Sequence, residues 1–161
     1  METRDLVALR DDAAKRLTVF IDPTRAAEQI VLTNELRPRD EDYAKVFVEK
    51  SVPAARAVYE KLWMNIPPIG AKPGQSVVLA WICMSDQLGS TVGRRFPGGY
   101  QKIIDRLVPD VPWVCWKFVE LGRMYGMAYD GLVRVDERWV WFPKPWKLLL
   151  PAESALMHWF D

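Results

Sequence analysis

The chain has 161 residues, 50% of them hydrophobic and 27% charged, which is typical of one globular domain with enough apolar side chain to build a core. Its 22 Lys and Arg residues balance 21 Asp and Glu residues, so the composition excludes a protein whose affinity comes from neutralising nucleic-acid phosphates. No stretch approaches the ~18 uninterrupted apolar residues of a membrane span, and the first residues lack a signal-peptide core, so we expect a cytoplasmic protein without a membrane partner.

The first third of the chain has helical periodicity. Apolar residues recur every three or four positions and predict a helix over residues 3–19, with a stripe of Leu6, Leu9, Ala13 and Leu17. Asp22 is a good N-cap and Pro23 suits a first helical turn, which predicts a second short helix ending near Asn34. The inward face of this second helix is expected to carry Ala26, Ala27, Ile30 and Val31.

The next segment repeats the same pattern twice. Asp40 can cap a helix that bears Tyr43, Val46 and Phe47. Pro53 either begins a new helix after Ser51 or kinks a longer one. We therefore expect the helical part to occupy about residues 1–65.

The pattern changes to strands after a proline- and glycine-rich loop. Residues 76–84, SVVLAWICM, are rich in Val, Ile and Trp and predict a buried strand, and residues 100–108 predict one short helix. Residues 111–120 alternate, with Val114, Trp116 and Phe118 on one face and Trp113, Cys115 and Lys117 on the other. Two further strands, 126–135 and 138–142, flank a connection of hairpin length.

Helices followed by a meander of strands predict an α+β fold, in which N-terminal helices pack on a curved antiparallel sheet. We expect a single domain over residues 1–161, with the sheet part at about 75–146. A short C-terminal tail then follows, in which Leu156, Trp159 and Phe160 are expected to pack inward.

Few residues are suited to catalysis. The only histidine, His158, lies three residues from the end, so motifs with two histidine ligands are impossible, and there is no C-x-x-C pair for zinc. Cys83 and Cys115 lie in apolar runs, which predicts buried, reduced thiols. We expect no metal, no cofactor and no catalytic residue.

Asp130 is the most informative carboxyl group because it lies inside a strand-like run, AYDGL. Pointing inward, it would need a partner or a raised pKa, and Tyr129 beside it could supply a hydroxyl. The same dipeptide, Asp130 and Gly131, is also typical of a turn or β-bulge, in which the aspartate bonds nearby backbone. A turn or bulge is the preferred interpretation.

GRRFPGGYQK offers a possible anion site. Arg94 and Arg95 precede a Pro-Gly turn and an expected helix start, where free N–H groups favour anions. The spacing matches no phosphate-binding loop, so a solvated arginine pair is the main alternative.

Tryptophan is frequent, with eight residues in the chain. Such aromatic residues can line a ligand cavity, form a partner surface or fill a core. The predicted binding residues are Trp116, Tyr129, Asp130, Trp139, Trp141 and Trp146. Within RWVWF, alternation puts Trp139 and Trp141 on one face and Val140 and Phe142 on the other, so we expect this strand to be covered on both faces.

YDGLVRVDERWVWF resembles the terminal hairpin of the nuclear-transport-factor-two-like and polyketide-cyclase-like cone fold, and the element order is similar. The resemblance implies helices leading into a curved antiparallel sheet. This chain differs from the family by the break at Pro53, by an extra helix near residues 99–107, and by lacking the His-Asp pair that several of its enzymes use. No catalytic residue carries over.

Two functions remain open. The first is a non-enzymatic binding protein of a bacterial accessory, adaptor or toxin-neutralising (immunity-like) type, which engages a protein partner or a second copy through an aromatic and arginine surface. The alternative is a cone-like pocket that binds or converts an apolar small molecule, with Asp130 and Tyr129 at its floor. A closed concavity lined by Trp116, Trp139 and Trp141, with Asp130 inside, would favour the pocket. Solid packing of these three residues, with an exposed aromatic patch elsewhere, would favour the protein partner.

Overall fold

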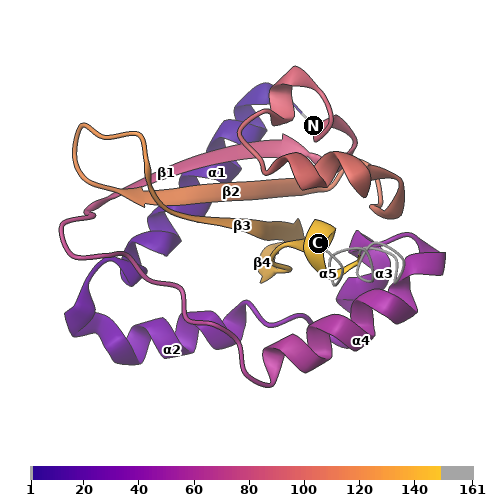
Figure 1. Ribbon diagram of the computed structural model, residues 1–161, viewed down its shortest axis with the longest axis horizontal. Helices are drawn as coiled ribbons and strands as arrows, with labels where there is room; N and C mark the ends of the chain where they lie inside the picture. Colours follow the sequence, from indigo (N-terminus) through magenta and orange to yellow (C-terminus); the bar gives the residue numbers. More distant parts are fainter. Residues whose placement is uncertain (1, 150–161) are drawn as a thin grey trace, which may run out of the picture.

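A computed structural model describes residues 2–149 of the protein (Figure 1). Its α-helices are α1 (Thr3–Leu17), α2 (Ala26–Glu35), α3 (Tyr43–Val46), α4 (Val52–Trp63) and α5 (Pro145–Leu148). Its strands are β1 (Val77–Met84), β2 (Pro112–Val119), β3 (Gly126–Val135) and β4 (Arg138–Trp141), which form one antiparallel sheet in chain order. The α+β prediction is confirmed. The tail, with its expected inward packing, and His158 lie outside the described residues.

The first two helices form where the sequence predicted them. Ala13 and Leu17 of the α1 stripe are buried, and the Asp22 carboxylate accepts a hydrogen bond from the Thr24 N–H at 2.9 Å. The predicted inward face of α2 is wrong, because Ile30 and Val31 are 64% and 58% exposed. Its inward side is the one that carries Leu32, and the helix ends at the buried Leu36.

The third and fourth helices are separate. Pro53 lies in the first turn of α4 and thus begins a new helix. The expected cap Asp40 is exposed, and Asp42, the residue directly before α3, makes no side-chain cap bond to the helix. The Asp42 carboxylate instead accepts the Arg39 N–H at 2.7 Å. Asp42 is fully buried and also pairs with Arg138 of β4, so the carboxylate ties the start of α3 to the sheet.

The sheet is covered on both faces. Pairing of Trp116 with Tyr129 and of Cys115 with Trp81 confirms the predicted alternation along β2. We call the face that carries Trp116 the α1 face, because α1 crosses behind the sheet there (Figure 1). We call the opposite face, which carries Cys115, the connection face, since the chain between β1 and β2 folds over part of it.

The connection between β1 and β2 contains short 3-10 turns. The single helix predicted for residues 100–108 is wrong, because Gly98–Lys102 and Ile104–Arg106 form two separate 3-10 segments. Two consecutive glycines weaken a helix start. Gly99 also lies so close to Trp146 that a Cβ there would be 2.6 Å from the indole ring.

The RWVWF strand divides its aromatic residues between the two faces. On the α1 face, Trp139 donates a hydrogen bond to Asp12 at 2.8 Å, and Trp141 meets Trp63 edge-on at 6.0 Å. On the connection face, Phe142 packs against aromatic residues of the α3 and α4 region, namely Tyr43, Phe47 and Tyr59. The strand is covered on both sides, as alternation predicted.

β1 differs from its prediction as a buried strand. Residues 77–82 are only partly buried, and only Cys83 and Met84 are fully covered. The reason is the strand order, since β1 pairs with β2 alone and lies at an edge of the sheet. No helix within residues 2–149 is both long and apolar enough to cross a bilayer.

Candidate functional site

A β-bulge interrupts β3 at Asp130 and Gly131, as predicted. The register between β2 and β3 shifts between Val114 and Trp116, so that one residue of β2 faces two of β3. Gly131 has φ +86°, and a Cβ at this position would lie 2.0 Å from the Phe142 carbonyl oxygen. Only glycine suits both the conformation and the space.

The bulge directs a buried carboxyl group toward the connection face. Asp130 is 5% exposed, and its Oδ1 accepts the Tyr100 hydroxyl at 2.6 Å and the Lys144 N–H at 2.9 Å. Its backbone oxygen accepts the Trp141 indole N–H at 2.8 Å. Within residues 2–149, Oδ2 has no hydrogen-bond partner.

Burial raises the pKa of the Asp130 carboxyl above its ordinary value, although the hydrogen bonds from Tyr100 and Lys144 oppose this rise. Burial also raises the pKa of Tyr100 well above 10, and the nearby Asp130 adds to the effect. Tyr100 therefore remains a hydrogen-bond donor, and the pair holds the connection against β3.

Tyr129 has a structural contact of its own. Its hydroxyl accepts the Gly70 N–H at 3.0 Å and donates to the Gly70 carbonyl at 2.9 Å. Its ring stacks on Trp116 with a centroid distance of 5.3 Å. The hydroxyl thus anchors the loop that follows α4 beside β3.

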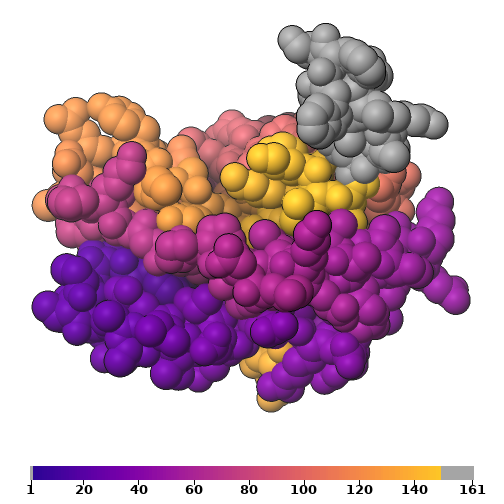
Figure 2. Space-filling view, turned by 60° about the horizontal axis from the view of Figure 1, so that its bottom comes forward, coloured from indigo at the N-terminus to yellow at the C-terminus, as the bar shows by residue number. Residues whose placement is uncertain are grey.

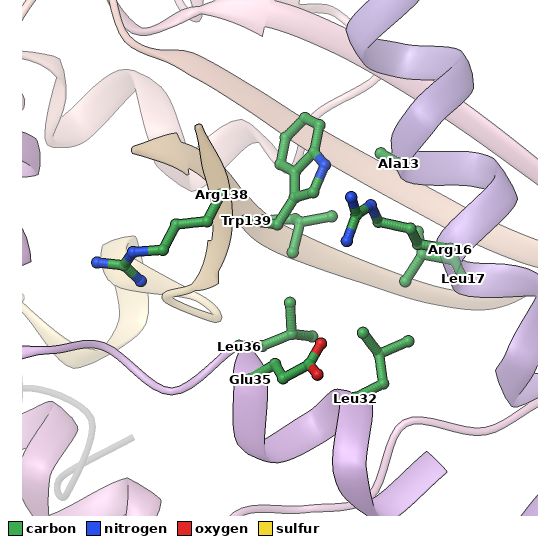
Figure 3. Close-up of a pocket in the computed structure, with 9 residues that line it drawn as sticks. Ala13, Arg16, Leu17, Leu32, Glu35, Leu36, Arg138 and Trp139 are labelled. Carbon is green, nitrogen blue, oxygen red and sulfur yellow. The ribbon is translucent and has the colours of Figure 1, made fainter. Parts of the chain in front are cut away.

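The predicted tryptophans do not share a concavity. Trp116, Trp139 and Trp141 are at most 3% exposed, and each borders a different cavity. Figure 3 shows the smallest, about 60 Å³, where Trp139 lies above leucines of α1 and α2. This cavity is too small for any ligand but a few water molecules. Trp146 is half-buried beside Gly99.

A groove follows the edge of β3 beyond the end of β4. We call it the β3-edge groove; its volume is about 400 Å³. Residues 127–130 all line it, and such consecutive residues point to alternate faces, so the groove opens along the strand edge. Its walls come from the loop after α4, from Trp141 and from the α5 region, and consist of Leu62, Pro67, Pro68, Trp141, Pro143, Lys144, Lys147 and Leu148.

The hairpin between β2 and β3 exposes a group of large apolar residues, which we call the hairpin tip. Leu121 is 84% exposed, Tyr125 72% and Met124 54%, and Arg123 lies among them. The hairpin extends away from the body of the protein (Figure 1). The sequence reasoning missed these residues, although LGRMYGM has apolar side chains where a solvated loop is usually polar.

The two arginines predicted to bind an anion lie in different places. Both arginines are exposed, but only Arg95 lines a hollow of about 220 Å³ on the connection face. We call this the Trp81 hollow. The segment after the Pro-Gly turn is a 3-10 turn of five residues, so no α-helix N-terminus supports an anion there.

The other groups considered within residues 2–149 are the two cysteine thiols and clusters that could bind a metal ion. Cys83 and Cys115 are buried free thiols, as predicted, and burial raises their pKa values to about 11 and about 12. Across this part of the chain, no group of three or more His, Cys, Asp or Glu side chains is placed to hold a metal ion.

Comparison with known proteins supplied no relative. A scan against protein-family models, a search of curated proteins and a search of solved structures each found no match for this chain. The resemblance to the cone fold therefore stays a prediction.

Proposed function

We propose that this protein is a non-enzymatic binding protein that holds an extended segment of a protein partner along the free edge of β3. The observation that carries the proposal is the short length of β4. It pairs with residues 132–135 of β3, and residues 126–129 have a strand partner only on the β2 side. Backbone groups on an open strand edge are ready to pair with another strand.

The surroundings of this edge favour a peptide. Pro143 prevents β4 from extending further, because proline lacks the N–H that a strand ladder needs. The groove walls are mostly apolar and can receive the alternate side chains of an added strand. Lys144 and Lys147 lie at one end and form no ion pair with another residue among those described, so they favour a partner segment with a carboxylate there.

The hairpin tip extends the same surface. Met127 is 37% exposed and lines the β3-edge groove as well as a second depression that includes Arg123 and Tyr125. In Figure 2 the hairpin (orange), the loop after α4 (magenta) and the start of α5 (yellow) lie on one side of the molecule. Tyrosine, methionine and arginine are enriched in protein interfaces, so the tip provides a second contact for the partner.

The alternative, a cone-like pocket for an apolar small molecule, was expected to gather Trp116, Trp139 and Trp141 around one concavity. These three side chains instead pack in the core beside separate cavities. The exposed patch at the hairpin tip is apolar and contains one aromatic residue, Tyr125, where an aromatic patch was expected. Both observations favour the partner-binding function.

The test is selection from a displayed library of random seven-residue peptides, followed by calorimetric titration of the best binders into the full chain. We expect enriched peptides with alternating apolar residues and an acidic end, and slower hydrogen exchange at residues 126–130 when they bind. Met127→Glu should weaken binding at least about tenfold, because it places a charge in an apolar groove. Ile30→Glu, the same kind of change on exposed α2, should not.

The proposal fails if the library yields no peptide that binds in solution. It also fails if Met127→Glu and Ile30→Glu bind a selected peptide equally well, since the bound surface would then lie elsewhere.

A further inference from the structure

The Trp81 hollow lies on the connection face, separate from the β3-edge groove except for the shared residues 128–130. Its base is formed by neighbouring positions of β1, β2 and β3, and the segment 95–97 of the connection forms a wall above them. Its lining consists of Trp81, Arg95, Phe96, Pro97, Cys115, Trp116, Lys117, Ala128, Tyr129 and Asp130. A volume of about 220 Å³ is below the usual range for drug-sized ligands and suits a molecule with a single ring.

Two cations meet at one aromatic ring of the hollow. The Arg95 guanidinium carbon lies 5.5 Å and the Lys117 ammonium nitrogen 5.9 Å from the centre of the Trp81 ring. Neither cation forms a salt bridge with an acidic residue in the range 2–149. Both cations line the hollow, so the positive charge around it favours an anionic ligand.

The segment that carries Arg95 is held in place. The Cys115 thiol donates to the Arg95 carbonyl oxygen at 3.5 Å, and Phe96 packs edge-on against Tyr100 at 5.6 Å. Tyr100 is in turn bonded to Asp130. The position of the Arg95 backbone is therefore set before any ligand binds, which lowers the entropy cost of binding.

The buried carboxyl of Asp130 lines the same hollow. It is 5% exposed, and its Oδ1 is already occupied by Tyr100 and Lys144, whereas no described residue donates to Oδ2. Oδ2 therefore keeps its acceptor capacity free, and a ligand that brings a hydrogen-bond donor into the hollow can bind it. Aromatic side chains, including Trp81 and Phe96, line the same hollow and can pack against an aromatic ring.

We propose that the Trp81 hollow binds a small aromatic carboxylate that carries a hydroxyl group at the opposite end of its ring. Arg95 and Lys117 hold the carboxylate, the ring lies beside Trp81 and Phe96, and the hydroxyl donates to Asp130 Oδ2. This site does not depend on peptide binding at the β3-edge groove.

Three probes separate the contributions: 4-hydroxyphenylpropionate, phenylpropionate without the hydroxyl, and 4-hydroxyphenylpropionamide without the charge. Calorimetric titration into the full chain measures each Kd, and quenching of tryptophan fluorescence provides a second readout. We expect the hydroxy acid to bind more tightly than either of the other two.

Variants test the residues. Arg95→Gln and Lys117→Gln should each weaken binding of the hydroxy acid about tenfold or more and leave the amide unchanged. Arg94→Gln is the matched control, because Arg94 is the exposed neighbour that does not line the hollow. Thermal unfolding of each variant checks that it folds.

The proposal is overturned if none of the three probes binds saturably, if the amide binds as tightly as the acid, or if Arg94→Gln weakens binding as much as Arg95→Gln. Met127→Glu should leave the Kd of the hydroxy acid unchanged, so that failure of this site and failure of the peptide groove can be told apart.

Discussion

The hydrogen bond between Tyr100 and Asp130 connects the β1–β2 connection to the β3 bulge, and Tyr100→Phe removes only this bond. The 2.6 Å contact is fully buried, with Tyr100 inaccessible and Asp130 5% exposed. A hydrogen bond to a charged group contributes about 1.5–3 kcal/mol. We therefore expect the free energy of unfolding at pH 7 to fall by about 2 kcal/mol, which for a chain of this size lowers Tm by roughly 4–8 °C.

The assay is urea denaturation at 25 °C, combined with calorimetric melting. Tyr125→Phe is the matched control, because that side chain is 72% exposed at the hairpin tip, and its stability should change by less than about 0.5 kcal/mol. Repeating Tyr100→Phe in an Asp130→Asn background replaces the charged acceptor with a neutral one, so the loss should shrink to about 1 kcal/mol.

The pH dependence has a definite sign. Burial raises the pKa of Asp130 in the folded protein above that of the unfolded chain, where aspartate titrates near ~3.9. Folding is therefore favoured by the protonated form, and this contribution is complete below the unfolded pKa and lost as the pH rises through the folded pKa. The stability of the native protein relative to Asp130→Asn should fall as the pH rises from about 3.5 to 7. The reasoning is refuted if that difference is constant or grows, or if Tyr100→Phe is neutral.

Three further experiments test the burial of Trp139, the bulge at Gly131 and the burial of the two cysteines. Trp139→Ala should destabilise the protein by about 3–5 kcal/mol in urea denaturation, because its indole is 3% exposed, and a neutral result would place it outside the core. Gly122→Ala should lower the free energy of unfolding by roughly 1 kcal/mol, because of its positive φ alone. Gly131→Ala should lower it clearly more, because its Cβ would also lie 2.0 Å from a carbonyl oxygen. Equal losses of stability would argue against the bulge. Cys83 and Cys115, with pKa values of about 11 and about 12, should resist iodoacetamide at pH 8 until denaturant is added, as followed by mass spectrometry, and rapid labelling of the native protein would contradict their burial.

Features that depend on a few neighbouring residues could be predicted. The α1 stripe, the cap at Asp22 and the restart at Pro53 follow from helical spacing and from the local chemistry of N–H groups and proline. The alternation of β2 and the bulge at Gly131 follow from strand geometry and from the conformational freedom of glycine.

Features that depend on the rotation of a helix about its axis or on the order of strands in the sheet could not be predicted from the sequence. Ile30 and Val31 are as apolar as Leu32 and Leu36, and only the packing of α2 decides which pair contacts the core. Of the candidate site, Asp130 and Tyr129 were found from the sequence, but Tyr100 and Lys144, which bind the Asp130 carboxylate, come from segments 30 and 14 residues away. Such long-range contacts leave no local pattern.

The sequence by itself determined the fold class and the division of RWVWF between two faces, and it favoured a turn or bulge at Asp130 and Gly131, because these depend on backbone geometry over a few residues. That the bulge turns the carboxyl inward was decided by the tertiary structure. The tertiary structure decided which surfaces stay open. β4 ends after Trp141, which leaves residues 126–130 of β3 without a second strand, and the connection covers the opposite face only in part, which leaves the Trp81 hollow. Both openings depend on where distant segments stop covering the sheet, and that depends on the packing of the whole chain.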